Sequence, residues 1–150
     1  MPFTIKEDSP NEAYEISLKI PEFSDPYKID EYQQRLNHRD HLVLLAFDNS
    51  ERKAVGFKVG YELTSDIFYS WMGGVLPKYR RHGIAESLAN YQEDWARKRH
   101  YKIIQMKTRE KHKAMIAFSL RRGFIIKSRI NNQFPAETRL IMEKLLLNKD

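Results

Sequence analysis

The chain has 150 residues and a formal net charge of +6, and 41% of its residues are hydrophobic. This length suits one hydrophobic core, so we expect residues 1–150 to form a single domain. So high a hydrophobic content excludes a disordered chain, and the absence of cysteine excludes disulfides and a thiolate nucleophile.

Segment lengths disfavour a membrane-spanning or secreted protein, and residue spacing disfavours a histidine metal site. The longest aliphatic run, residues 42–47, is too short to cross a bilayer, and residues 1–6 lack the apolar core of a signal peptide. The five histidines show no spacing typical of metal ligands. The sequence therefore predicts a cytoplasmic protein without a metal ion or a membrane partner.

The first half of the chain predicts two short helices followed by strands. Ser9 and Pro10 are typical of the N-cap and first position of a helix, and Asp30 is predicted to cap the second helix. Clean alternation over residues 54–63 predicts a strand, and Gly73 with Gly74 indicates a bulge or a close backbone approach. The predicted elements are a strand at 3–5, helices at 10–20 and 31–37, and strands at 42–47, 54–63 and 67–75.

The second half predicts helices alternating with strands. Residues 84–99 form an amphipathic pattern that directs Ile84, Leu88, Tyr91 and Trp95 toward a core. A strand at 101–108 and a helix at 111–122 follow, and Gly123 is typical of the residue after a helix C-terminus. Strands at 124–130 and 139–147 complete the chain. Hairpins mixed with helical crossovers predict an α+β fold.

The segment 75–85 joins a predicted strand to the long helix. A helix N-terminus behind a glycine directs its backbone N–H groups at one point, and Arg80, Arg81 and His82 add positive charge there. The segment therefore favours an anion, such as a phosphate or a pyrophosphate.

The pattern Arg80-x-x-Gly83-x-Ala85, preceded by Val75-x-Pro77, resembles the acyl-CoA pyrophosphate loop of the GCN5-related N-acetyltransferase (GNAT) family. Residues 114–124, which end in Gly123-Phe124, resemble the next helix of that family. The resemblance covers residues 40–130 well. It implies a mixed, mostly antiparallel sheet of about seven strands with about four helices. It also implies transfer of an acetyl group from acetyl-CoA to an amine.

The resemblance also implies which residues hold acetyl-CoA. Val75 would bond the pantetheine arm through its main chain, and N–H groups of residues 81–85 would hold the pyrophosphate. A side chain at Gly83 would crowd the phosphate. His112 stands where relatives often have an asparagine that contacts CoA, although it also fits a surface histidine at a helix start. The predicted cofactor-binding residues are Val75, Leu76, Pro77, Arg80, Arg81, His82, Gly83, Ile84, Ala85 and His112.

Three residues are candidates for the base that deprotonates the amine. Glu62 lies near the end of a predicted central strand, on the face opposite Tyr61. Partial burial would raise the pKa of this carboxyl and suit it to general-base catalysis, whereas a solvated strand-end carboxylate would have no such role. Tyr69 is the second candidate, because its strand often supplies the base in relatives, and Glu22 is the third.

The chain departs from the family pattern at the residue expected to protonate the leaving thiolate. Ser119, four residues before Gly123, occupies the position where many relatives carry a tyrosine. A serine hydroxyl is a poor acid, so Ser119 is expected to bond the CoA sulfur or hold a water. Phe23 and Tyr27, between the first two helices, are candidates for lining the acceptor pocket, or they cover the core.

Other functions stay open at this point. An acyl-CoA-binding domain without turnover would also lack the tyrosine, and the basic segment 79–82 is compatible with a nucleic-acid-binding module, although no motif supports one. The late strands of this family commonly pair subunits, so a homodimer is an option. The acceptor is not readable from the sequence: a small amine, a peptide N-terminus, a lysine side chain and an antibiotic all fit.

Overall fold

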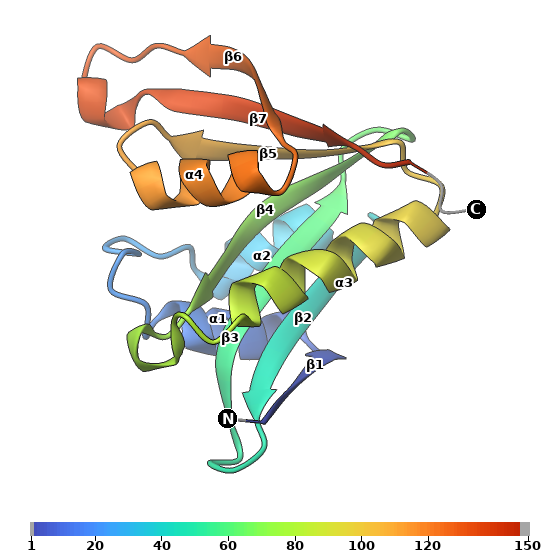
Figure 1. The fold of residues 1–150 in the computed structure, drawn as a ribbon, viewed down its shortest axis with the longest axis vertical. Coiled ribbons are helices and arrows are strands. Elements are labelled where there is room, and N and C mark those ends of the chain that lie inside the picture. Colours follow the sequence, from blue (N-terminus) through green and yellow to red (C-terminus); the bar gives the residue numbers. More distant parts are fainter. Residues whose placement is uncertain (1, 148–150) are drawn as a thin grey trace. The chain divides into compact units, whose positions relative to one another are not determined.

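A computed structural model describes residues 2–147 and contains a seven-stranded mixed sheet with four α-helices in that range (Figure 1). The strand order is β1-β2-β3-β4-β5-β7-β6. β4 and β5 pair in parallel, whereas β1 with β2, β2 with β3, β5 with β7, and β6 with β7 pair antiparallel. The predicted α+β fold is therefore confirmed.

The strands are β1 (Phe3–Glu7), β2 (His41–Asp48), β3 (Lys53–Glu62), β4 (Ile67–Val75), β5 (Ile103–Arg109), β6 (Ile125–Ile130) and β7 (Arg139–Leu145). The helices are α1 (Pro10–Ser17), α2 (Ile29–Leu36), α3 (Ile84–Lys98) and α4 (Lys113–Arg121). Two short 3₁₀ turns are η1 (Pro77–Tyr79) and η2 (Pro135–Glu137).

Contacts divide these elements into two compact units. The first unit runs to Glu62 and includes Trp71–Trp95, so it holds β1 to β3, the end of β4, α1, α2 and most of α3. The second unit takes Leu63–Ser70 and the chain from Ala96 onward, with β5, α4, β6 and β7.

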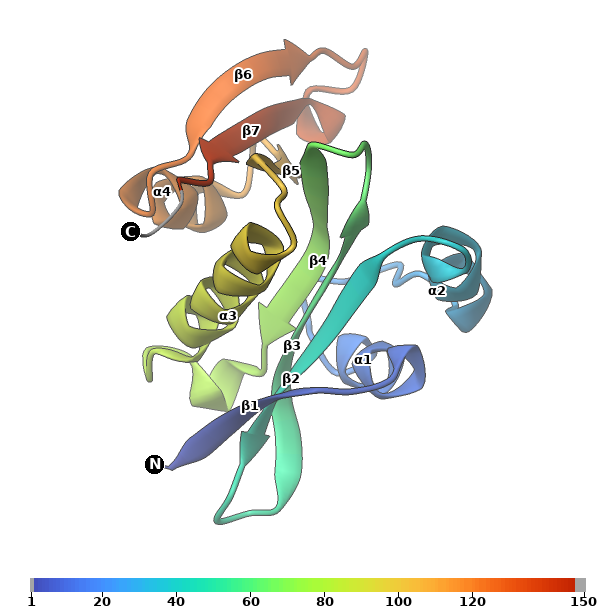
Figure 2. The same cartoon turned by 90° about the vertical axis from the view of Figure 1, so that its right-hand side faces the viewer.

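The core of the first unit lies on both faces of β2 and β3. Helices α1 and α2 lie on one face of these strands and α3 lies on the other (Figure 2). As the aliphatic run predicted, the β2 residues from Leu42 to Ala46 are all buried. Two-sided burial explains why this strand shows no polar alternation.

Glycines bring the backbones of β3 and β4 close to their neighbours. A Cβ built on Gly73 would lie 3.0 Å from the carbonyl oxygen of Phe57, and one built on Gly74 would lie 2.5 Å from Cδ1 of Ile20. At Gly73 the structure supports the predicted close backbone approach, whereas Gly74 makes room for the end of a side chain.

The second unit packs α4 on one face of its strands. The α4 residue Ser119 is buried, and its hydroxyl donates a hydrogen bond to Sδ of Met106 in β5, at 3.2 Å. Gly123, with φ of 95°, ends the helix, and the N–H groups of Gly123 and Phe124 donate to the carbonyls of Leu120 and Ser119. This paired pattern is a Schellman motif, as the glycine predicted.

Helix α4 is shorter than the predicted 111–122, and α1 and α2 also differ from their predicted boundaries. α1 ends at Ser17, whose hydroxyl donates to the carbonyl of Tyr14, so Ile20 is buried from a turn instead of from the helix. α2 begins at Ile29 with Lys28 at its N-cap, so the prediction of Asp30 as cap is wrong. Asp30 lies in the first turn, where a carboxylate is favoured by the helix dipole.

The inward face of α3 is also rotated from the predicted one. Ile84 and Leu88 are buried as expected, but Tyr91 and Trp95 are only half-buried. The other buried residues of the helix are Ala89, Gln92, Glu93 and Ala96. The buried residues after Ile84 recur at intervals of three and four, so they form an amphipathic stripe that is displaced by one residue from Tyr91 and Trp95.

Asp48 fixes the turn between β2 and β3. Its Oδ1 accepts from the N–H groups of Ser50 at 2.9 Å and Glu51 at 3.4 Å, and Tyr79 adds a side-chain hydrogen bond. Desolvation opposes ionisation, but these hydrogen bonds win, and they hold the pKa of Asp48 below its ordinary value of 3.8. The ionised carboxylate is therefore the form that stabilises the fold.

We expect Asp48→Asn to lower the melting temperature at pH 7. A depressed pKa gives a stabilisation that is present above the unfolded-state value and lost as the pH falls through the folded-state value. The gap between wild type and variant should therefore close below about pH 4, as measured by thermal melts between pH 7 and pH 2.5. Asp25→Asn, an exposed control in the same unit, should leave the melting temperature unchanged; a pH-independent gap for Asp48→Asn would contradict the assignment.

Candidate functional site

The end of β4 leads directly into the predicted anion-binding loop. Val75 is buried, and the N–H of Leu76 donates to the carbonyl of Val55 at 2.8 Å, which holds the chain against β3 as it leaves the strand. Pro77 then begins η1, and the fixed φ of proline suits the first position of a helical turn. The strand, the turn and α3 thus follow one another as the sequence predicted.

The loop reaches α3 through two left-handed residues. Arg81 has φ of 66° and Gly83 has φ of 79°. The carbonyl of Gly83 accepts the first helical hydrogen bond, from the N–H of Ser87 at 3.0 Å. The N–H groups of the first turn have no acceptor within the helix, so they are available to a ligand. Arg81 and His82 are exposed beside this turn, which makes it favourable for an anion.

Gly83 leaves open space in front of this turn. A Cβ built on it would have no atom within 4 Å, so the conformational requirement for glycine comes from its positive φ. A longer side chain at this position would occupy the open space. The residues present therefore fit a pyrophosphate.

The side chain of Arg80 forms hydrogen bonds to two other residues of the protein. Its Nε donates to the carbonyl of Val75 at 3.0 Å, and its two terminal nitrogens donate to the two oxygens of Glu22 at 2.8 and 2.7 Å. The bond to Glu22 raises the pKa of Arg80 above its ordinary value, against the opposing effect of burial. Arg80 thus connects the loop after α1 to the end of β4.

The same pair bears on Glu22 as a candidate base. Both carboxylate oxygens accept from the guanidinium, and such a bidentate pair stabilises the ionised form. A carboxylate held this way is a weak proton acceptor. No local sequence pattern indicates this pair, because the two residues lie 58 positions apart.

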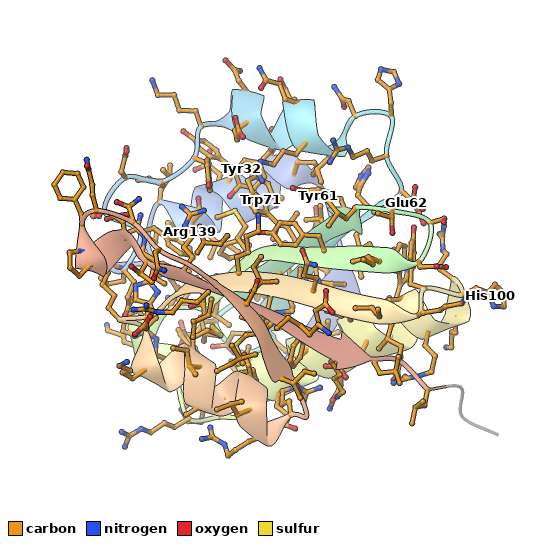
Figure 3. All side chains as sticks on the ribbon, turned by 90° about the horizontal axis from the view of Figure 1, so that it is seen from above. Tyr32, Tyr61, Glu62, Trp71, His100 and Arg139 are labelled. Carbon is orange, nitrogen blue, oxygen red and sulfur yellow. The ribbon has the colours of Figure 1, made fainter. Side chains whose placement is uncertain are left out.

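Glu62 is the last residue of β3 and is half-buried. Its N–H donates to the carbonyl of Asp40 at 2.8 Å, which fixes the backbone at this strand end. Tyr61 points to the opposite face, as the alternation predicted; it is buried, and its hydroxyl accepts from Arg35 at 2.9 Å. Figure 3 shows Tyr61 beside Trp71, with Glu62 farther along the strand.

Trp71 is the centre of an aromatic cluster that the sequence did not predict. Its ring lies 5.1 Å from that of Tyr27, 5.0 Å from that of Tyr32 and 6.1 Å from that of Tyr61, and Arg35 lies 4.5 Å above it. Burial raises the pKa of Tyr32. The cluster comes from α2, β3, β4 and a loop, so no local pattern could have revealed it.

The two residues expected to line an acceptor pocket have different surroundings. Phe23 is half-buried and meets the core residue Phe57 edge to face at 6.2 Å. Tyr27 is 39% exposed, and its ring lies 5.1 Å from that of Trp71 and 5.3 Å from the guanidinium carbon of Arg35. Tyr27 is therefore the one of the two that presents an accessible ring.

The second unit holds the other three candidates. Tyr69 is buried in β4 with the ammonium group of Lys107 5.8 Å from its ring centre. Ser119 is buried with its hydroxyl on the sulfur of Met106. His112 is exposed at the N-cap of α4 and makes no side-chain capping bond there. Tyr69 and Lys107 are thus brought together, a contact that the sequence did not indicate.

Residues 2–147 contain neither a metal-binding cluster nor a membrane-spanning helix. No cluster of three or more His, Cys, Asp or Glu side chains suited to a metal ion occurs among them. No helix in that range is both long and apolar enough to cross a membrane.

Comparison with known proteins agrees with this geometry. The model of the acetyltransferase (GNAT) family matches residues 9–124, which confirms the resemblance noted at the loop. A search among curated proteins found no match.

Several solved structures share the fold. The ribosomal-protein-S18-alanine N-acetyltransferase from Escherichia coli is 20% identical with a TM-score of 0.84, over 99% of this chain and 97% of that one. The NatC complex bound to Gag peptide and CoA gives 23% identity and a TM-score of 0.80, over 98% and 100%. A family member from Elizabethkingia anophelis with acetyl-CoA bound gives 17% and 0.74, over 96% and 98%.

Proposed function

The chain belongs to the acetyltransferase (GNAT) family, and from this premise we propose that it transfers the acetyl group of acetyl-CoA to a primary amine. The observation that carries the proposal is the turn into α3, where two left-handed residues and the open space at Gly83 leave N–H groups directed at an anion. Acetyl-CoA carries such an anion in its pyrophosphate. The solved relatives that contain CoA or acetyl-CoA support this choice of co-substrate.

In the proposed reaction the amine nitrogen attacks the thioester carbonyl. A bond forms between nitrogen and the acetyl carbon, the bond between that carbon and sulfur breaks, and the sulfur leaves as a thiolate. The ammonium must lose one proton before attack, the nitrogen loses a second proton as the amide forms, and the thiolate takes one up. The first loss of a proton from nitrogen and the protonation of the thiolate are the two transfers that the protein's side chains can assist.

We assign the first transfer to Glu62 and keep Tyr69 as the second candidate. Glu62 is a half-buried carboxylate at the end of a central strand, whereas both carboxylate oxygens of Glu22 accept hydrogen bonds from Arg80. Tyr69 is buried next to a lysine, so it fits a role in orienting a water or the amine.

The second transfer needs no tyrosine. A thiol has a pKa of about 8.5, so a thiolate leaves at neutral pH with water as its proton source. Ser119 directs its hydroxyl at a methionine sulfur and is buried, which supports a packing and positioning role.

The test of the cofactor assignment is Gly83→Glu. We expect wild type to bind acetyl-CoA with micromolar affinity by calorimetry and Gly83→Glu to show no binding, because the carboxylate fills and repels the phosphate position. Gly83→Ala is the matched control, since it shares the backbone strain but adds only a methyl group; it should bind more weakly than wild type yet measurably. Equal binding by wild type and Gly83→Glu would refute the assignment, and binding of DNA without any response to CoA would favour the nucleic-acid alternative.

For the base, Glu62→Gln should lower kcat by at least about 10²-fold, the range typical of losing a general base. CoA affinity should stay nearly unchanged, because Glu62 lies on a different strand from the loop. Glu51→Gln, at an exposed turn of the same unit, is the control and should turn over normally. Normal turnover by Glu62→Gln across the pH range would transfer the assignment to Tyr69.

For the acid, Ser119→Ala should reduce kcat by less than about tenfold, or 1.4 kcal/mol. The variant loses only a hydrogen bond to a thioether, which is a weak acceptor, so the melting temperature should change little as well. A 10³-fold loss of kcat with intact CoA binding would show that the hydroxyl is essential. Binding of acetyl-CoA without transfer by wild type to any amine would identify a domain without turnover.

A further inference from the structure

Positive charge is concentrated in the second unit. This unit has 15 Lys and Arg residues against 5 Asp and Glu, a formal charge of +10, whereas the first unit has 11 against 15, a formal charge of −4. The anion-binding loop at residues 80–83 belongs to the first unit, so acetyl-CoA binding there leaves the excess unexplained. The positions of these cations along the strands determine which face of the sheet they occupy.

Strand alternation separates the sheet of the second unit into two faces. Met106 and its alternate neighbours face α4, whose Ser119 hydroxyl lies on Met106. The opposite face presents Lys107, Arg109 and Arg139, which we call the cation row. Figure 2 shows α4 on one side of β5 and β7, and among the described residues no helix of this unit covers the other side.

The cation row contains an unfavourable pair. Arg109 and Arg139 are register partners on β5 and β7, and like charges directly opposite one another destabilise a strand pair. Glu137 lies 3.1 Å from Arg109, but Arg139 is exposed and has no ion pair within residues 2–147. An anion bound between the two guanidinium groups would relieve this repulsion.

The row extends toward a candidate catalytic residue. Lys107 lies on the same face as Tyr69, with its ammonium 5.8 Å from the ring centre, and Tyr69 is in register with Gln105. The acidic side chain on this face beyond Lys107 is Glu143, which accepts a hydrogen bond from Gln105 at 2.8 Å. The carboxylates on this face are thus already engaged by neighbours, while the cations outnumber them.

We propose that the cation row binds the carboxylates of an acidic polypeptide whose amine is the acetyl acceptor. Lys107 and Arg109 are two positions apart on one strand, roughly 7 Å, and Arg139 is one strand away, roughly 5 Å. Side chains on the same side of an extended peptide are also about 7 Å apart, so successive acidic residues match this spacing. A single amino acid is too small to contact the whole row, and polycationic acceptors such as polyamines or aminoglycosides are repelled.

This inference rests on the proposed function, and its test compares two peptides. One carries Glu at positions 3, 5 and 7 after the amine, and the other carries Gln at the same positions. At saturating acetyl-CoA and about 20 mM salt, we expect kcat/KM for the acidic peptide to be at least tenfold higher. The ratio should fall toward one at about 0.5 M salt, because the Debye length shortens to a few ångströms.

The variant Arg139→Glu separates recognition from folding. It places opposite charges across the strand pair, so its melting temperature should equal or exceed that of wild type, while the preference for the acidic peptide disappears. Arg121→Glu is the matched control. It makes the same change in net charge at an exposed position on α4, on the other face of the sheet, and should keep the preference within about twofold.

The outcomes distinguish this inference from the proposed function. Equal transfer to both peptides overturns the cation row as an acceptor site and leaves the acetyltransferase activity standing. If no transfer occurs, fluorescence anisotropy of the labelled peptides still reports on the row: selective binding of the acidic peptide, lost in Arg139→Glu, supports it, and no binding overturns it. Tighter binding of single-stranded RNA than of the acidic peptide at 0.15 M salt would overturn the polypeptide as its occupant.

Discussion

Close packing in the first unit depends on glycines that no other residue can replace without displacing backbone. A Cβ on Gly56 would lie 3.2 Å from the carbonyl oxygen of Gly74, and one on Gly73 would lie 3.0 Å from that of Phe57. Backbone atoms cannot rotate away as the end of a side chain can. The position of the end of β4, and with it the turn into α3, is therefore set by this approach.

Arg80 adds a second constraint at the same place. It joins the carbonyl of Val75 to the carboxylate of Glu22, so the loop after α1 is held at the end of β4. Partly exposed ion pairs contribute only about 0–1 kcal/mol to stability. The pair therefore matters more for geometry than for the free energy of unfolding. It engages the guanidinium of Arg80, which the sequence alone assigned to phosphate binding.

Charge is distributed in a way that suits two anionic molecules. The first unit is acidic as a whole but has exposed cations beside the turn into α3, and the second unit is basic, with the cation row on the sheet face opposite α4. On our proposals, the first feature receives the pyrophosphate of acetyl-CoA and the second receives the carboxylates of the acceptor. Electrostatic attraction of this kind raises association rates and weakens with salt.

Local signals were enough to predict the strands, the Schellman end of α4 and the loop from Val75 to Ala85, because periodicity, glycine position and helix ends are encoded within a few residues. They did not predict the pair between Arg80 and Glu22, or the cluster around Trp71, whose members lie far apart in the chain. The opposition of Arg109 and Arg139 depends on strand register, which a one-residue slip would change completely. Such contacts arise only when the tertiary fold brings distant segments together.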